Sequence, residues 1–189
     1  MRIICCKFGD KFSSWHVDNL RHMIDTYSGI EYDKFEVIED DLYGNWYNKF
    51  QMYDKFRDDT NIYFDLDMVI FGKLRRLQRN HFTLLNDTWW REPAHTPLNS
   101  SIVAWTGDVS YIWDKFKSNE EYYLKRYNKG SDEFYYHEIK YQEFPDICPS
   151  IKNHLSKKPE DYNVCTFGQM HHLMEVGWTG WWTNFFLSR

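Results

Sequence analysis

Apolar and polar residues follow two different spacings along the first third of the chain. Short β-branched or apolar runs that end in glycine or acidic residues predict buried strands at 3–7, 35–38 and 62–64. Between these runs, apolar residues recur at the spacing of a helix, over 17–27 and over 46–56. This part of the chain is therefore expected to form a strand, helix, strand, helix, strand unit.

Polar residues and a glycine mark the limits of the first predicted helix. Ser13 or Ser14 can cap its start, because a serine hydroxyl accepts hydrogen bonds from the unpaired amides of the first turn, and Ser28 with Gly29 ends it. The alternation of strands and helices favours a mainly parallel sheet with right-handed crossovers and helices on both faces. We therefore expect an α/β fold, a three-layer sandwich that binds ligands beyond the carboxyl ends of its strands.

The pattern becomes less regular from His81 onward. Before that point, residues 68–71 continue the apolar character of the third strand as far as Gly72. Further along we expect short strands at 82–85, 101–105 and 164–167, helices at 109–116 and 132–139, and loops at 91–98 and 144–149. The sequence has no internal repeat, low-complexity tract or linker, so residues 1–189 are expected to form one domain.

Composition narrows the possible functions. Aromatic residues make up 20% of the chain, which favours a substantial core and is compatible with a ligand cleft. The net charge of −5 argues against a nucleic-acid partner, which needs a concentrated basic surface. No run approaches the ~20 apolar residues that cross a bilayer, and the apolar start is too short for a secretory signal, so a soluble, cytoplasmic protein is expected. The four cysteines form no CxxC pair, and Cys5 and Cys6 should point to opposite faces of one strand in the reduced state.

The segment IYFDLDMVIF, residues 62–71, carries the clearest candidate chemistry. In an extended chain residues i and i+2 face the same way, so Asp65 and Asp67 can present two carboxylates together at the end of the third strand. A hard divalent cation, Mg²⁺ or Mn²⁺, binds one or two such carboxylates and keeps its other positions for water and phosphate oxygens. A capped turn or a salt-bridged pair is the alternative that the local sequence leaves open.

This segment resembles the Asp-x-Asp strand of GT-A-fold glycosyltransferases, especially the compact bacterial and phage type that reads "YLDLDVVI". Further segments resemble the same family in the same order along nearly the whole chain. They are IICCKFGDKF at 3–12 ("VCVKWGxKY"), VIEDD at 37–41 ("CLTDD"), GNWYNKFQMY at 44–53 ("GWWNKLELF"), NSSIVAW at 99–105 ("NSSVMLW"), YIWDKF at 111–116 ("HIWERF") and GSDEFYYH at 130–137 ("GGDQDWISH"). The resemblance implies a Rossmann-like GT-A fold and transfer of a sugar from a nucleoside-diphosphate sugar to the hydroxyl of a glycan or other acceptor.

The resemblance also implies roles for individual polar residues. Asp65 and Asp67 would hold Mn²⁺ or Mg²⁺ and the diphosphate, with Asp65 also near the ribose. Asp132 would lie close to the donor sugar and the acceptor, where its carboxylate could bind hydroxyls or act as a base. The other donor-binding candidates are Asp40 for the nucleoside, Asn48 and Lys49 for the phosphate region, and Asn99 and Ser100 for the sugar hydroxyls.

Each of these residues also has a purely structural interpretation, which the sequence leaves open. The alternatives are a surface lysine at Lys49, a backbone-bonded amide at Asn48, turn residues at Asn99 and Ser100, a first-turn helix acid at Asp132 and a solvated turn at Asp40. The three-dimensional arrangement of the side chains has to separate these interpretations from the functional ones.

One position departs from the family pattern. The family tends to read "VVFHG" near the C-terminus, with a histidine that can complete the metal site, whereas this chain has Phe167 there, in VCTFG at 164–168. The metal would then be held by the two aspartates, water and diphosphate, or with help from His171 or His172. Imidazole suits Mn²⁺ better than Mg²⁺, so such a substitution would favour manganese. The alternatives are that His171 and His172 are ordinary, partly exposed histidines, or that the activity of the protein is reduced or lost.

Two other classes of function compete with a transferase. A strand that ends in Asp-x-Asp also resembles the nucleophile motif of haloacid-dehalogenase-type phosphatases, but Met68 and Val69 stand where those sequences have the Gly and Thr of "DxDGT". A non-enzymatic carbohydrate-binding module would account for the aromatic richness and for the missing histidine. The transferase predicts nucleotide binding that needs a metal, whereas the binding module predicts sugar binding that needs neither.

Overall fold

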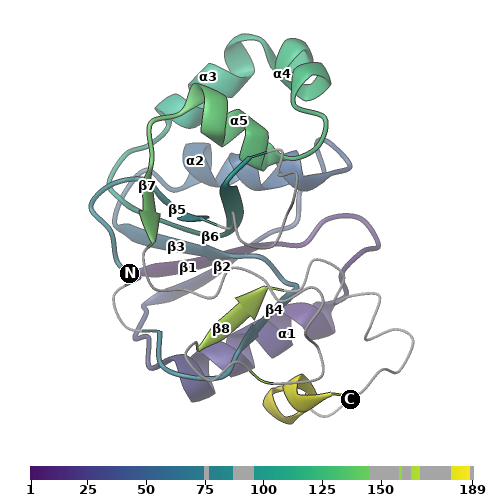
Figure 1. Cartoon of the computed structure of the whole chain (residues 1–189), viewed down its shortest axis with the longest axis vertical. Coiled ribbons are helices and arrows are strands. Elements are labelled where there is room, and N and C mark those ends of the chain that lie inside the picture. Colours follow the sequence, from purple (N-terminus) through teal and green to yellow (C-terminus); the bar gives the residue numbers. More distant parts are fainter. Residues whose placement is uncertain (75–76, 87–95, 145–157, 159–162, 167–179, 188–189) are drawn as a thin grey trace.

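The structure is a computed structural model that describes residues 1–74, 77–86, 96–144, 158, 163–166 and 180–187. Its centre is a six-stranded sheet with the strand order β2-β1-β3-β6-β5-β7 (Figure 1). The strands are β1 (Arg2–Cys6), β2 (Lys34–Ile38), β3 (Thr60–Phe64), β5 (Thr83–Asn86), β6 (Leu98–Thr106) and β7 (Gln142–Phe144).

The sheet is mainly parallel, as the sequence predicts. β1 runs parallel to both β2 and β3, and β5 runs parallel to β7, whereas β6 is antiparallel to β3 and β5. Because β6 runs against β3, the first residues of β6 lie beside the last residues of β3, and Phe64 pairs with Ile102. The carboxyl end of β3 and the amino end of β6 therefore meet at one edge of the sheet.

Two layers cover the sheet (Figure 1). On one face lie α2 (Gln51–Lys55), α3 (Tyr111–Ser118), α4 (Glu120–Arg126) and α5 (Ser131–Glu138), with the 3₁₀ helix η2 (Trp46–Phe50) leading into α2. On the other face lie α1 (Ser14–Met23), its π-helical continuation η1 (Ile24–Ser28), a two-stranded sheet of β4 (Met68–Ile70) and β8 (Val164–Thr166), and the 3₁₀ helix η3 (Trp181–Phe185). This arrangement is the predicted three-layer α/β sandwich.

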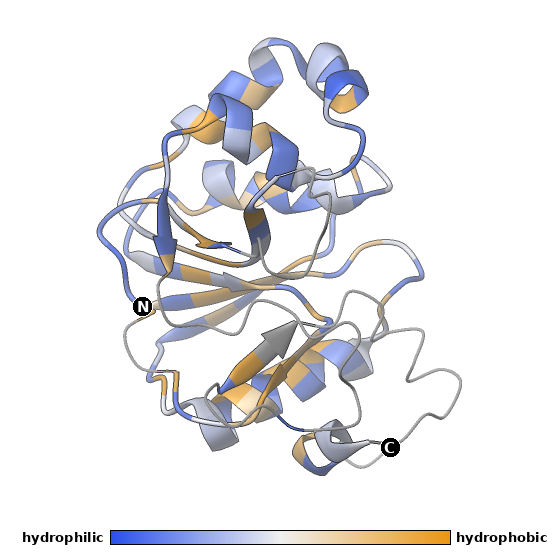
Figure 2. Cartoon of the chain, in the orientation of Figure 1, coloured by the Kyte–Doolittle hydropathy of each residue, from blue (hydrophilic) through white to orange (hydrophobic). Residues whose placement is uncertain are grey.

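Alternation along the central strands produces two cores, one on each face of the sheet. In β1, Ile3 and Cys5 belong to the core on the α1 side, whereas Ile4 and Cys6 belong to the core on the α2–α5 side. Successive side chains of a strand point to opposite faces, so each strand contributes to both cores. The opposite orientation predicted for the two neighbouring cysteines is confirmed. Figure 2 shows hydrophobic colouring on the central strands and on β4, and hydrophilic colouring along much of α3, α4 and α5.

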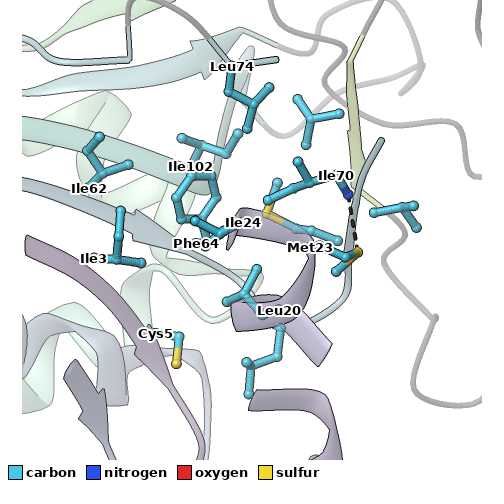
Figure 3. Packing of buried hydrophobic residues seen from close by; sticks show 14 of the residues in the cluster. Ile3, Cys5, Leu20, Met23, Ile24, Ile62, Phe64, Ile70, Leu74 and Ile102 are labelled. Carbon is cyan, nitrogen blue, oxygen red and sulfur yellow. Dashed lines mark hydrogen bonds between the residues drawn. The ribbon is translucent and has the colours of Figure 1, made fainter. Parts of the chain in front are cut away.

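The core on the α1 side joins α1 and β4 to the central sheet (Figure 3). Leu20 and Met23 of α1 are fully buried in the same cluster as Phe64 of β3. The backbone amide of Ile70 in β4 donates a hydrogen bond to the Met23 sulfur at 3.4 Å. β4 pairs with β8 and so forms a separate small sheet after the end of β3.

Two predicted loops are shorter than the sequence suggests. Leu98, placed in the loop 91–98, begins β6 because it pairs with β5. Phe144, placed in the loop 144–149, ends β7 because it too pairs with β5. Pairing with β5 thus extends β6 and β7 into the predicted loops. Turn-forming residues in the local sequence do not reveal such pairing. Residues 91–95 and 145–149 lie outside the described residues.

The helices also depart from the sequence pattern at particular points. The predicted helix 46–56 begins as a 3₁₀ helix and becomes α-helical only from Gln51. The predicted helices 109–116 and 132–139 correspond to α3 and α5. Helix α4 was not predicted. Tyr123 is its single buried residue, and one buried residue cannot show the helical spacing by which the other helices were recognised.

Candidate functional site

A hollow of about 260 Å³ lies where the end of β3 meets the start of β6. Its charged wall consists of three lysines and three aspartates, Lys11, Lys49, Lys129, Asp65, Asp67 and Asp132. A smaller hollow of about 70 Å³ shares Asp65 and Asp67 with it and is otherwise lined mainly by apolar and aromatic side chains. The larger hollow brings together six of the predicted site residues, Lys49, Asp65, Asp67, Asn99, Ser100 and Asp132.

Asp65 is fixed by contacts from three other residues. Its backbone amide donates to the Ser101 carbonyl at 2.8 Å, which ties the chain after β3 to β6. Its Oδ1 accepts a hydrogen bond from the Tyr63 hydroxyl at 2.5 Å and lies 3.5 Å from the Lys49 ammonium. Both side-chain contacts engage Oδ1, so Oδ2 has no hydrogen-bond partner among the residues that the structure describes.

Asp67 is a buried carboxylate, with 8% of the residue exposed. In the described part of the chain, no other residue donates a hydrogen bond to it or forms an ion pair with it. Burial and the nearby charge of Asp65 raise the pKa of Asp67 to about 7, while Lys11 acts in the opposite direction. A buried carboxylate beside a second one is unfavourable unless positive charge lies close by. This part of the hollow is therefore suited to binding a cation.

Lys49 is buried, so the interpretation as a surface lysine is wrong. Its ammonium donates to the Ser100 carbonyl at 3.0 Å and lies 3.5 Å from Asp65 Oδ1. It also lies 5.1 Å from the centre of the Tyr63 ring, within the range of a cation–π interaction. Lys49 thus joins η2 to the start of β6 and to the acidic end of β3.

Asp132 reaches the hollow from the first turn of α5. Its Oδ1 accepts hydrogen bonds from the Ser100 backbone amide at 3.0 Å and from the Ser100 hydroxyl. The same hydroxyl lies 3.3 Å from the Ser131 hydroxyl. Asp132 is therefore the first-turn acid of α5, as its structural interpretation has it, and also lines the hollow, so a role toward a sugar or an acceptor stays a prediction.

β6 is irregular where it borders the hollow. Val103 lies opposite Leu84, but Asn99 lies opposite Leu85, so residues 100–102 are passed over in the register between β5 and β6. The Asn99 Oδ1 accepts a hydrogen bond from the Ser101 amide at 2.8 Å within this stretch. Irregularities of this kind redirect side chains beside functional sites. Asn99 and Ser100 are thus strand residues at a bulge, and the interpretation as turn residues is wrong.

Two of the predicted donor-binding residues do not line the hollows. Asp40 lies in the exposed turn after β2, where its carboxylate pairs with Lys55 at 2.6 Å. Asn48 is fully buried, and its Oδ1 accepts hydrogen bonds from the amides of Leu42 and Tyr43 at 2.7 and 3.1 Å. Asn48 therefore holds the loop before η2, in keeping with its structural interpretation.

Six residues that line the larger hollow were not singled out from the sequence, among them two lysines and a tryptophan. Lys11 lies between β1 and α1, Trp46 begins η2, and Lys129 comes just before α5. The position of Lys11 was a usable signal, since the segment after the first strand of a parallel sheet lies at the ligand-binding edge. Lys129 gave no such signal, because it reaches the hollow only through the packing of α4 and α5.

The acidic pair fits a hard divalent cation. Carboxylate oxygens are preferred ligands of Mg²⁺ and Mn²⁺, and a pair of them leaves room for water and phosphate. Within the described residues no group of three or more His, Cys, Asp or Glu side chains is placed to hold a metal ion. Within these residues, Asp65 and Asp67 are therefore not joined by a third side chain of this kind in a metal-binding arrangement. The predicted ligand His171, the alternative His172 and Phe167 lie outside the described residues.

No protein-family model matches the sequence, and no curated protein sequence matches it either. Several solved structures are similar in three dimensions. A glycosyltransferase involved in the glycosylation of the major capsid of PBCV-1 has a TM-score of 0.66 and 12% identity, over 93% of this chain and 98% of its own. The galactosyltransferase LgtC, solved in complex with donor and acceptor sugar analogs, has a TM-score of 0.59 and 10% identity, over 89% of this chain and 87% of its own.

The glycosyltransferase GlyE of Streptococcus pneumoniae TIGR4 is also similar, with a TM-score of 0.56 and 12% identity over 77% of this chain. The match spans 46% of the GlyE structure, less than half of its length. These neighbours are GT-A-type glycosyltransferases, and the chain has their fold, as the sequence resemblance implied. Among the helices that the structure describes, none has the length and apolar character that a membrane crossing requires.

Proposed function

We propose that the chain is a glycosyltransferase that transfers a sugar from a nucleoside-diphosphate sugar to an acceptor hydroxyl, with Mn²⁺ or Mg²⁺ bound by Asp65 and Asp67. The GT-A-type fold of its structural neighbours supports sugar transfer in general. The hollow at the end of β3 supports the donor and the cation, because its wall combines paired carboxylates with lysines and hydroxyl-binding groups.

The observation that carries the proposal is the environment of Asp67. This carboxylate is buried beside Asp65 at the hollow, and no other described residue pairs with it. A structural role would require a compensating donor or cation from the protein, as a buried carboxylate is otherwise strongly unfavourable. A bound divalent cation supplies that compensation and explains why both carboxylates face the same hollow.

Each wall residue has a distinct task in this proposal. The cation, when bound, would neutralise the charge on the departing diphosphate. Lys49 keeps Asp65 oriented through its contact with Oδ1. Asn99 and Ser100 would bind hydroxyls of the donor sugar. Asp132, oriented by Ser100, would bind a sugar hydroxyl or take the proton of the acceptor hydroxyl as a general base.

The two predicted residues outside the hollow take part less directly. Asn48 would influence the site through the loop that it holds before η2. Contact between Asp40 and the nucleoside would require its ion pair with Lys55 to open. Both side chains of that pair are exposed, at 66% for Asp40 and 40% for Lys55, so opening it costs little.

A thermal-shift experiment tests this proposal. UDP or GDP should raise the melting temperature only when Mn²⁺ or Mg²⁺ is present, because the diphosphate needs the cation to bind beside two carboxylates. At a hundredfold excess over the dissociation constant, binding stabilises the folded state by about 2.7 kcal/mol. Asp67→Ala and the nearly isosteric Asp67→Asn should both remove this stabilisation.

Asp18→Ala is the matched control, since Asp18 is an exposed aspartate on α1 and does not line the hollow. It should keep the full response to nucleotide and metal. A flat response of the unmodified protein to every nucleotide and metal pair would contradict the proposal. Sugar binding by a protein that shows no response to any nucleotide and metal pair would instead favour a binding module, and a stable beryllofluoride adduct at Asp65 would favour a phosphatase.

A further inference from the structure

Trp46 is an exposed aromatic residue in an otherwise buried helix. It is 44% exposed, whereas Tyr47, Asn48, Lys49 and Phe50, which complete η2, are all buried. In the described part of the chain its indole ring packs against no other aromatic ring and no cation. Exposing so large an apolar surface to water is unfavourable. A role outside the folding of η2 would account for this placement.

The backbone that carries Trp46 is rigidly held. Asn45 caps η2 by accepting a hydrogen bond from the Tyr47 amide at 2.9 Å. The Asn48 side-chain amide donates to Asp41 Oδ1 at 2.7 Å and to the Asn45 carbonyl at 3.0 Å. These bonds fix the loop and the first turn of η2 before any ligand arrives. Binding of a ligand to the indole therefore carries no entropy cost for ordering this part of the backbone.

Trp46 lines both hollows of the site. The groups that suit the donor lie deeper, since Asp67, Asn99 and Ser100 are between 3% and 9% exposed. Trp46 is far more exposed than these groups and lines the same hollow as Asp132. In the proposed function the donor occupies the deeper groups, which leaves the exposed indole and Asp132 for the acceptor.

We propose that the indole of Trp46 is the platform for a pyranose ring of the acceptor, so that the acceptor is a saccharide. This inference rests on the proposed function, because it assumes that the deeper groups hold the donor. A pyranose has one face of C–H groups that packs on an aromatic ring, and hydroxyls around its edge that need polar partners. The larger hollow supplies both, because Trp46, Asp132 and Lys129 all line it.

The proposal is tested by the binding of simple glycosides. Saturation-transfer NMR with a panel of methyl pyranosides, in the absence of nucleotide, should show binding to the unmodified protein. Trp46→Ala should weaken it by about tenfold, the size expected for loss of one aromatic packing contact. Trp46→Phe should retain most of it. Tyr111→Ala, which removes an aromatic residue 48% exposed and outside the hollows, should leave it unchanged.

A second measurement separates the platform from the donor site. The rise in melting temperature with nucleotide and Mn²⁺ should be the same in Trp46→Ala as in the unmodified protein. The proposal is overturned if no pyranoside binds the unmodified protein, if Trp46→Ala binds pyranosides normally, or if Trp46→Ala loses the nucleotide response. Pyranoside binding that depends on Trp46, in a protein that binds no nucleotide with any metal, would refute the proposed function and leave the saccharide platform standing.

Discussion

At the scale of single residues, the buried ammonium of Lys49 organises the candidate site. It donates to the Ser100 carbonyl at 3.0 Å and approaches Asp65 Oδ1 to 3.5 Å, so it connects η2 with β6 and with the end of β3. Ser100 in turn donates its backbone amide to Asp132. A continuous set of polar contacts therefore runs from Asp65 to Asp132 across the floor of the hollow. Lys49 thus orients Asp65, one of the two carboxylates proposed to bind the cation.

Replacing Lys49 should affect both stability and nucleotide binding. Lys49→Met keeps most of the side-chain volume but leaves the buried Ser100 carbonyl without its donor and Asp65 without its cation. We expect a loss of about 1–3 kcal/mol in the free energy of unfolding, the usual cost of an unsatisfied buried polar group. Urea denaturation measures this loss, and the melting-temperature response to nucleotide and Mn²⁺ should be weaker in the same variant.

Lys11→Met is the comparison for this variant, because Lys11 lines the same hollow but is exposed. Its removal should leave the free energy of unfolding nearly unchanged. Equal stability of the two variants would contradict the orienting role of Lys49. An unstable Lys49→Met protein with a normal nucleotide response would restrict Lys49 to a structural role.

At the scale of elements, the left-handed backbone conformation of Gly29 ends the first helical segment, α1 with η1. Gly29 follows η1 with φ of +66°, in the left-handed region that side chains disfavour. The Leu74 amide donates to the Ser28 carbonyl at 2.8 Å just before this turn, so the helix end is joined to the segment after β4. This hydrogen bond connects the end of η1 to the segment that follows Asp67 and β4 along the chain.

Gly29→Ala should destabilise the protein through backbone strain alone. An added Cβ would meet the Lys73 side chain at 3.7 Å, an ordinary contact, so no steric clash contributes. We expect the free energy of unfolding to fall by about 1–2 kcal/mol, the cost of a left-handed conformation for an L-residue. Gly29→Asn should lose less, since asparagine tolerates this conformation. Urea denaturation of both variants measures the two losses in the free energy of unfolding. An alanine variant as stable as the asparagine variant would contradict the role of backbone strain.

At the scale of the whole molecule, one sheet is shared by two cores. The core on the α1 side also includes Trp182 of η3, which is 3% exposed although it lies far along the chain. Trp181 packs on Phe71 with ring centres 5.1 Å apart, next to β4. Both tryptophans thus pack η3 onto the rest of the chain.

Trp182→Ala should cost about 3–5 kcal/mol, as expected for removal of a large buried aromatic side chain. Trp181→Ala should cost less, because Trp181 is only partly buried. Because both cores share the central sheet, each variant should unfold in a single transition that moves to lower temperature. Calorimetry measures both effects. Two separate transitions would contradict the expectation of one domain, and equal losses would contradict the difference in burial.

The sequence by itself determined most of the elements and the mainly parallel character of the sheet. Short apolar runs marked β1, β2 and β3, helical spacing marked α1, α3 and α5, and both are properties of neighbouring residues. The acidic pair was visible for the same reason, since Asp65 and Asp67 directly follow a buried strand. Helix α4 was missed because its one buried residue leaves no repeating pattern.

Only the tertiary structure decided which polar residues share the hollow. Lys49 is buried because Ser100, distant along the chain, supplies its partner, and Asn48 holds a loop because amides of that loop turn toward it. Asn99 and Ser100 reach the hollow because β6 runs antiparallel to β3 and is irregular against β5. Such contacts join residues separated by many positions, and their energies depend on burial that no local pattern encodes.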